Sequence, residues 1–169
     1  MRLYFSNMDI EFKIAELVDI ISEDVSRLAS RSYAEDGSSL YDGIKLTSRD
    51  SAVQGRMLEE RDARLRDILA FCIMEPSEEE PKAEAGDIPD EPKYVYPLQL
   101  NGMKNHVIAS LRVLMRKYLT EGVLFDWYER HAIDSSYTRE GIEDLETRIV
   151  CMVRQGYVKK PLQPFGPAD

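Results

Sequence analysis

Residues 101–131 read NGMKNHVIASLRVLMRKYLTEGVLFDWYERH, and this stretch decides the predicted fold. Its apolar side chains recur at steps of three and four residues, which is the spacing of one face of an α-helix. Asn101 can cap the start of that helix, and no proline or polar cluster interrupts it before His131. Gly122 either ends the helix or lies within it at a kink. The uninterrupted pattern favours one helix over residues 101–131.

Three more stretches show the same periodicity. The first covers about residues 8–30, the second about 48–74 and the third about 137–155. Each carries one apolar stripe and therefore needs a neighbour against which to bury it. The sequence thus predicts an all-α fold, a single domain over residues 1–169 that is like a four-helix bundle.

The acidic charge of the chain is concentrated in one segment. The formal net charge is −9, and residues 75–93 contribute eight acids against two lysines, or −6, which leaves −3 for the rest. The same segment holds four of the eight prolines, and such a composition cannot bury enough apolar surface to offset its ordering entropy. We therefore expect a long, disordered acidic linker between the second and third helices.

Two segments next to the helices are expected to be extended. Tyr94-Val95-Tyr96 favours a short strand, which could pair with residues 2–5 or with residues 44–46. The C-terminal residues 157–169 contain three prolines, which exclude a regular helix and predict an extended tail.

The sequence contains no pattern that identifies a catalytic site. It has no Gly-x-Gly-x-x-Gly, Walker or Gly-x-Ser-x-Gly motif, so neither a phosphate-binding loop nor an activated serine is expected. The residues three positions before His106 and His131 are not glutamates, which argues against a carboxylate di-iron bundle. His131 is instead expected to contact the last carbonyl groups of its helix. We predict no catalytic residue, no cofactor and no resident metal.

Two acids are nevertheless placed where a metal ion could bind. Some all-α nucleotide pyrophosphohydrolases hold Mg²⁺ with acids spaced along helices. Asp62 and Glu146 flank the apolar stripes of their helices and could face a shared groove that binds a hard cation. Helix surfaces are rich in acids that pair with arginine or lysine, and that ordinary interpretation is favoured.

Composition also limits the compartment and the partners. The acidic balance argues against nucleic-acid or anionic-membrane binding, since both need a basic surface, and no apolar run is long enough to span a bilayer. Cys72 and Cys151 each lie in an apolar helical pattern, which indicates buried thiols in a reducing cytoplasm. A disulfide between the two cysteines stays open.

The segment of residues 123–128 is apolar nearly all round its helix. Such a helix is either central to its own fold or covered by a partner subunit, and the first is favoured. In the tail, apolar side chains are expected to hold an arm against the bundle or a neighbour, and residues 161–164 also form a PxxP ligand shape. The candidate interface residues are Phe125, Trp127, Tyr128, Leu162 and Phe165.

Residues 105–115, NHVIASLRVLM, followed by Trp127-Tyr128, resemble the long helix of small all-α phage and prophage head–tail connector proteins. In that family an apolar helix ends in an aromatic pair. The resemblance implies a non-enzymatic ring component whose tail is an inter-subunit arm. The long acidic linker and the long first helix depart from the compact pattern of the family.

Taken together, these observations predict a non-catalytic structural or interaction protein that forms homo-oligomers or binds other assembly proteins. The resemblance places it in a prophage and its virion, and otherwise a cytoplasmic location is expected. One alternative is a metal-dependent nucleotide pyrophosphohydrolase that uses Asp62 and Glu146. Another is a regulatory adaptor whose acidic linker mimics a polyanion for a basic partner.

Overall fold

The computed structural model describes residues 7–31, 51–73, 91–100, 103–133 and 135–156. The described part is mostly helical, with two strands. Its elements are β1 (Asn7–Lys13), α1 (Ile14–Ala29), α3 (Ser51–Leu69), β2 (Lys93–Gln99), α4 (Asn105–Arg130) and α5 (Arg139–Gly156). The helical class predicted from the sequence is therefore right, but the fold is not purely α-helical.

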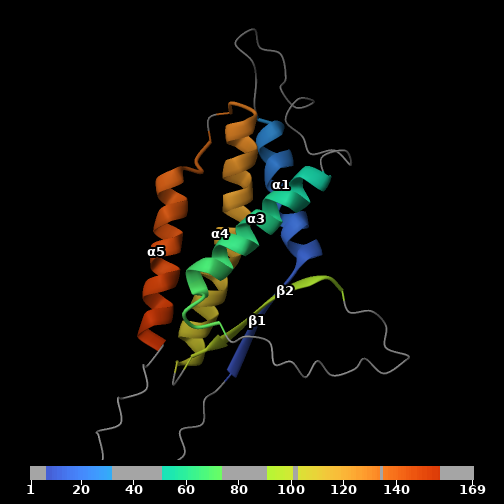
Figure 1. Cartoon of the computed structure of the whole chain (residues 1–169). Helices are drawn as coiled ribbons and strands as arrows, with labels where there is room; N and C mark the ends of the chain where they lie inside the picture. Colours follow the sequence, from blue (N-terminus) through green and yellow to red (C-terminus); the bar gives the residue numbers. More distant parts are fainter. Residues whose placement is uncertain (1–6, 32–50, 74–90, 101–102, 134, 157–169) are drawn as a thin grey trace, which may run out of the picture.

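The longest helix, α4, is the centre of the arrangement. It packs against α1, α3 and α5, and α3 crosses in front of it obliquely (Figure 1). The helix runs without a break through Gly122, as the periodicity predicts. It begins at Asn105 rather than at residue 101, because Lys104 has an extended backbone. Its buried side chains include Leu111, Met115 and Tyr118.

The segment predicted as the start of the first helix is a strand. Residues 8–13 were assigned to a helix that begins near residue 8, but they lie in β1, and α1 begins only at Ile14. Met8, Ile10 and Phe12 alternate with three charged residues, and this period of two is the pattern of a strand with one buried face. Ile10 fits both this pattern and the helical pattern, which explains the wrong boundary.

The strand predicted at Tyr94–Tyr96 is confirmed, whereas its two expected partners, residues 2–5 and 44–46, lie outside the described residues. β2 pairs with β1 in antiparallel register, with Ile10 opposite Tyr96. The expected linker, residues 75–93, therefore ends too late, because Lys93 already belongs to β2. The rest of that linker up to residue 90 lies outside the described residues, as do the expected tail 157–169 and residues 44–46.

The remaining helix boundaries differ from the prediction by a few residues. α3 ends at Leu69 rather than at residue 74, because the chain turns there and Ile73 forms a bridge to Leu98 of β2. α5 covers Arg139–Gly156, close to the predicted 137–155. None of the described helices is long and apolar enough to cross a membrane.

The two thiols differ in their surroundings. Cys72 is 2% exposed, and its Sγ donates to the carbonyl oxygen of Leu69 at 3.1 Å. Cys151 is exposed, so the expectation that both thiols are buried is wrong. It lies two residues from both Ile149 and Val153, which are buried, and a two-residue step turns a side chain to the opposite side of a helix. Both cysteines are free.

Candidate functional site

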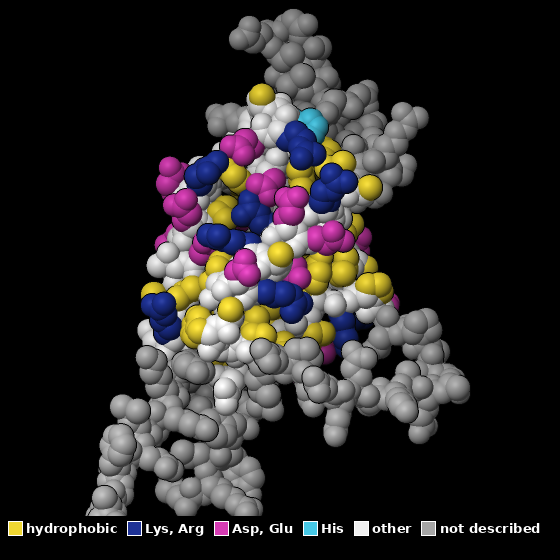
Figure 2. Space-filling model, in the orientation of Figure 1, with side chains coloured by type: hydrophobic (Ala, Val, Ile, Leu, Met, Phe, Trp, Pro, Cys, Tyr) yellow, Lys and Arg dark blue, Asp and Glu magenta, His cyan; other side chains and the backbone are white. Residues whose placement is uncertain are grey.

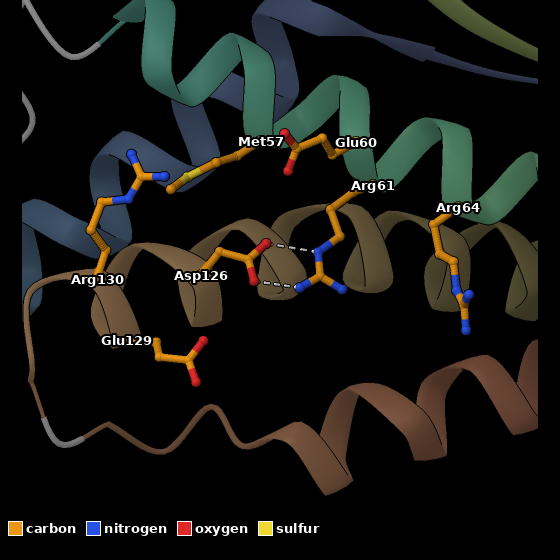
Figure 3. A pocket seen from close by; sticks show the side chains of 7 residues that line it. All are labelled: Met57, Glu60, Arg61, Arg64, Asp126, Glu129 and Arg130. Atoms are coloured by element: carbon orange, nitrogen blue, oxygen red, sulfur yellow. Dashed lines mark hydrogen bonds and ion pairs between the residues drawn. The ribbon is translucent and has the colours of Figure 1, made fainter.

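A hollow lies between α3 and α4. It has a volume of about 490 Å³ and continues into a second hollow of about 300 Å³ towards α5. We call the two together the three-helix groove. The larger part is lined by Met57, Glu60, Arg61, Arg64, Asp126, Glu129 and Arg130 (Figure 3). Phe125, Arg139, Ile142, Glu143 and Glu146 complete the lining of the smaller part.

An ion pair between Arg61 and Asp126 separates the two parts of the groove. The Arg61 Nε donates to one carboxylate oxygen at 2.9 Å, and its Nη2 donates to the other at 2.6 Å. The side chains are 17% and 27% exposed, so water screens this pair less than a surface pair. Burial alone lowers the pKa of Arg61, but the hydrogen bonds and charge of Asp126 outweigh it and raise the pKa. Arg61 therefore carries a permanent charge.

Gly122 lets the Arg61 side chain lie against α4. A Cβ at this position would be 2.9 Å from both Cδ and Nε of Arg61, closer than such atoms pack. Tyr118, Gly122 and Asp126 follow one another at intervals of four residues and so lie along one face of α4. The guanidinium of Arg61 is also 6.0 Å from the centre of the Tyr118 ring. The approach of Arg61 to α4 at Gly122 was not predicted from the sequence. The sequence feature that could have indicated it is a glycine within an apolar helix, one turn before Asp126.

The same face of α4 is joined to α5. The Tyr118 hydroxyl donates to Glu146 Oε1 at 2.8 Å, and Arg64 Nε of α3 lies 3.4 Å from the same oxygen. Burial, followed by the hydrogen bond and charge of Glu146, raises the pKa of Tyr118 to about 12. A connected polar network therefore joins α3, α4 and α5 beneath the groove.

The two candidate metal ligands have separate partners. Asp62 accepts a hydrogen bond from the Tyr96 hydroxyl at 2.6 Å and pairs with Arg66 at 2.9 Å, so it joins α3 to the sheet. Glu146 is held by Tyr118 and Arg64 instead. Within the described ranges, no group of three or more His, Cys, Asp or Glu side chains could hold a metal ion.

The aromatic interface candidates fall into two groups. Trp127 and Tyr128 are 3% and 1% exposed and belong to the core of this chain. Phe125 is partly buried, lines the groove and lies beneath Arg139, whose guanidinium is 5.9 Å from the ring centre. Leu162 and Phe165 lie outside the described residues. His131, as expected, contacts its own helix: its Nδ1 is 2.8 Å from the carbonyl oxygen of Trp127.

The rim of the larger part of the groove carries two charges that have no ion pair within the described part of the chain, Glu60 and Arg130. Both side chains are exposed, and in Figure 3 no dashed line joins either of them to another of the side chains drawn. Elsewhere on this face, basic and acidic side chains alternate without a large patch of one sign (Figure 2). Such a surface suits contact with another protein better than binding of a polyanion.

Comparison with known proteins adds no relative: the chain matches no protein-family model, no curated protein and no solved structure.

Proposed function

We propose that the protein is a non-catalytic structural protein that self-associates, and that two copies meet through the three-helix groove. The observation that carries this proposal is the pair of oppositely charged rim residues, Glu60 and Arg130, which are exposed and form no ion pair with any residue that the structure describes. The larger part of the groove is lined by three arginines and three acids, so its net charge is zero. Arginine-rich polar surfaces of this kind are common in protein interfaces.

A two-fold contact satisfies both charges at once. In a symmetric dimer the same surface is used on both copies, so Glu60 of one copy faces Arg130 of the other, and the reverse pair forms as well. Exposed ion pairs contribute only about 0.2–1 kcal/mol each. Partly buried Phe125, which lines the smaller part, supplies apolar contact between the copies. The net charge of about −3 outside residues 75–93 opposes this association only weakly.

The resemblance to phage head–tail connector proteins extends the proposal to a biological setting, the assembly of a virion. In that setting the protein is a virion-assembly component, cytoplasmic before assembly and part of the particle afterwards. The connector-like residues 105–115 and the aromatic pair Trp127-Tyr128 belong to one 26-residue helix, α4, which supports this setting. In this proposal the residues from 75 up to the start of β2 at Lys93 are an acidic linker, residues 157–169 are an inter-subunit arm, and the helices form a bundle-like domain.

Size-exclusion chromatography with light scattering of the full chain tests self-association. The monomer mass is 19.4 kDa, and the measured mass should rise towards twice that value as the concentration increases. A mass several times larger would indicate the ring that the connector setting implies. A mass that stays at 19.4 kDa at the highest concentration would contradict the proposal.

A further inference from the structure

A hollow separate from both parts of the three-helix groove lies near the ends of α1 and α4 and the connection to α5. Figure 1 shows where these ends meet that connection. The volume of the hollow is about 150 Å³, and none of its lining residues belongs to the three-helix groove. A water molecule occupies about 30 Å³ of liquid, so this space is large enough for a small tetrahedral oxyanion. The side chains that matter are Arg27, Arg31, Tyr128, Ser136, Tyr137 and Asp24.

A buried tyrosine whose hydroxyl has no partner among the described residues lines this hollow. Tyr128 is 1% exposed, and within the described part of the chain its Oη has no hydrogen-bond partner. An unpaired buried donor destabilises a fold, so buried hydroxyls almost always have a partner. Burial raises the pKa of Tyr128 to about 12, while the positive charge of Arg27 acts to lower it. At neutral pH this phenol therefore keeps its proton and is available to donate it.

The other groups around the hollow are mainly donors with positive charge. The Arg31 guanidinium and the Ser136 hydroxyl are exposed and have no ion pair or hydrogen bond with another described residue. Of the described residues in the lining, Asp24 is the only acid, and it already pairs with Arg27 and accepts a hydrogen bond from the Tyr137 hydroxyl at 2.6 Å. The lining therefore has a formal charge of +1, and the unused groups donate hydrogen bonds rather than accept them.

We propose that this hollow binds a small tetrahedral oxyanion, phosphate or the phosphate group of a small phosphomonoester. The Tyr128 hydroxyl, Arg31 and the Ser136 hydroxyl would donate to its oxygens, and Arg27 would add positive charge. A water molecule could accept the hydrogen bond of the Tyr128 hydroxyl, but it has no charge to balance Arg27 and Arg31, which have only Asp24 as a counter-charge within the described lining. An anion accepts that hydrogen bond and also balances the second positive charge, through charge-assisted hydrogen bonds.

Isothermal titration calorimetry of the full chain with inorganic phosphate, at constant ionic strength, tests the proposal. The key variant is Tyr128→Phe, which keeps the ring and its stacking on Tyr137, at 5.9 Å between ring centres, but removes the hydroxyl. One hydrogen bond to a charged group is worth about 1.5–3 kcal/mol, so the Kd should increase by about tenfold or more. Arg31→Gln, at an exposed position, should weaken binding by a similar factor.

Tyr118→Phe is the matched control, because Tyr118 lies on the same helix but does not line this hollow. Its phosphate affinity should equal that of the unchanged protein. Parallel titrations with glycerol 3-phosphate show whether free phosphate or a phosphomonoester is preferred. Absence of phosphate binding at tens of millimolar, or an equal Kd for Tyr128→Phe and the unchanged protein, would overturn the proposal. Melting curves in phosphate-free buffer should show Tyr128→Phe folded and no less stable, since it loses an unpaired buried donor.

Discussion

The side chain of Arg61 lies so close to α4 at Gly122 that a Cβ at residue 122 would approach its Cδ and Nε to 2.9 Å. A shift of Arg61 away from that Cβ would strain its two hydrogen bonds to Asp126. Gly122 therefore has a packing function in a helix where glycine is otherwise unfavourable.

Gly122→Ala should destabilise the protein. Alanine is favoured over glycine in a helix by about 1 kcal/mol, but overpacking typically costs about 1–3 kcal/mol. The expected net loss in the free energy of unfolding is about 1 kcal/mol, measured by urea denaturation. In a chain that also carries Arg61→Ala, the steric conflict is gone, and Gly122→Ala should stabilise instead.

Gly55→Ala is the control for this substitution. Gly55 lies within α3, and a Cβ there would meet nothing within 4 Å. Only the helix preference remains, so the free energy of unfolding should increase by about 0.5–1 kcal/mol. If Gly55→Ala and Gly122→Ala changed the free energy of unfolding equally, the Arg61 side chain would not restrict which residue fits at position 122.

Stability should fall in alkaline solution. Burial raises the pKa values of Tyr118 and Tyr128 from the ordinary 10.0 to about 12. Between pH 10 and 12 the unfolded chain loses these protons while the folded chain keeps them. The unfolded state then binds fewer protons, so the free energy of unfolding decreases as the pH rises through this range. Urea denaturation at a series of pH values should show this decrease, and Tyr118→Phe should make it shallower. An unchanged slope in that variant would argue against a raised pKa at Tyr118.

The two thiols should differ in reactivity. Burial raises the pKa of Cys72 to about 12, and the thiolate is the reactive form, whereas Cys151 is exposed. A disulfide reagent at neutral pH should titrate one thiol per folded chain and two after denaturation. Cys151→Ser should abolish the reaction of the folded protein. Rapid reaction of both thiols without denaturant would show that Cys72 is not protected by the fold.

The sequence predicted the helices better than the sheet, for physical reasons. In α4, apolar side chains recur at helical spacing over many turns, so its continuity through Gly122 was predictable. Residues 7–13 form only seven positions, and Ile10 satisfies both the helical and the alternating pattern. Their pairing with β2 joins segments more than 80 residues apart, which periodicity cannot reveal.

The candidate site was predictable only in part, since it depends on tertiary contacts. The aromatic character of residues 123–128 pointed to Phe125, but the sequence does not distinguish its partly exposed position from the buried positions of Trp127 and Tyr128. Glu146 was selected as an acid beside an apolar stripe. Its partners, Tyr118 and Arg64, come from two other helices, so the role of Glu146 as an acceptor that joins helices appears only in the fold.

The central claim is that two copies pair Glu60 with Arg130 across the three-helix groove, and charge reversal tests it most directly. Sedimentation velocity should show that Glu60→Arg alone and Arg130→Glu alone are both monomeric. Each places like charges together at two contacts, which we expect to raise the dimer Kd by about 30-fold or more.

An equimolar mixture of the two single variants should form dimers again, since one groove then offers two positive and the other two negative charges. The doubly reversed chain should also dimerise. If both single variants dimerise like the unchanged protein, or if their mixture stays monomeric, the three-helix groove is not the contact surface.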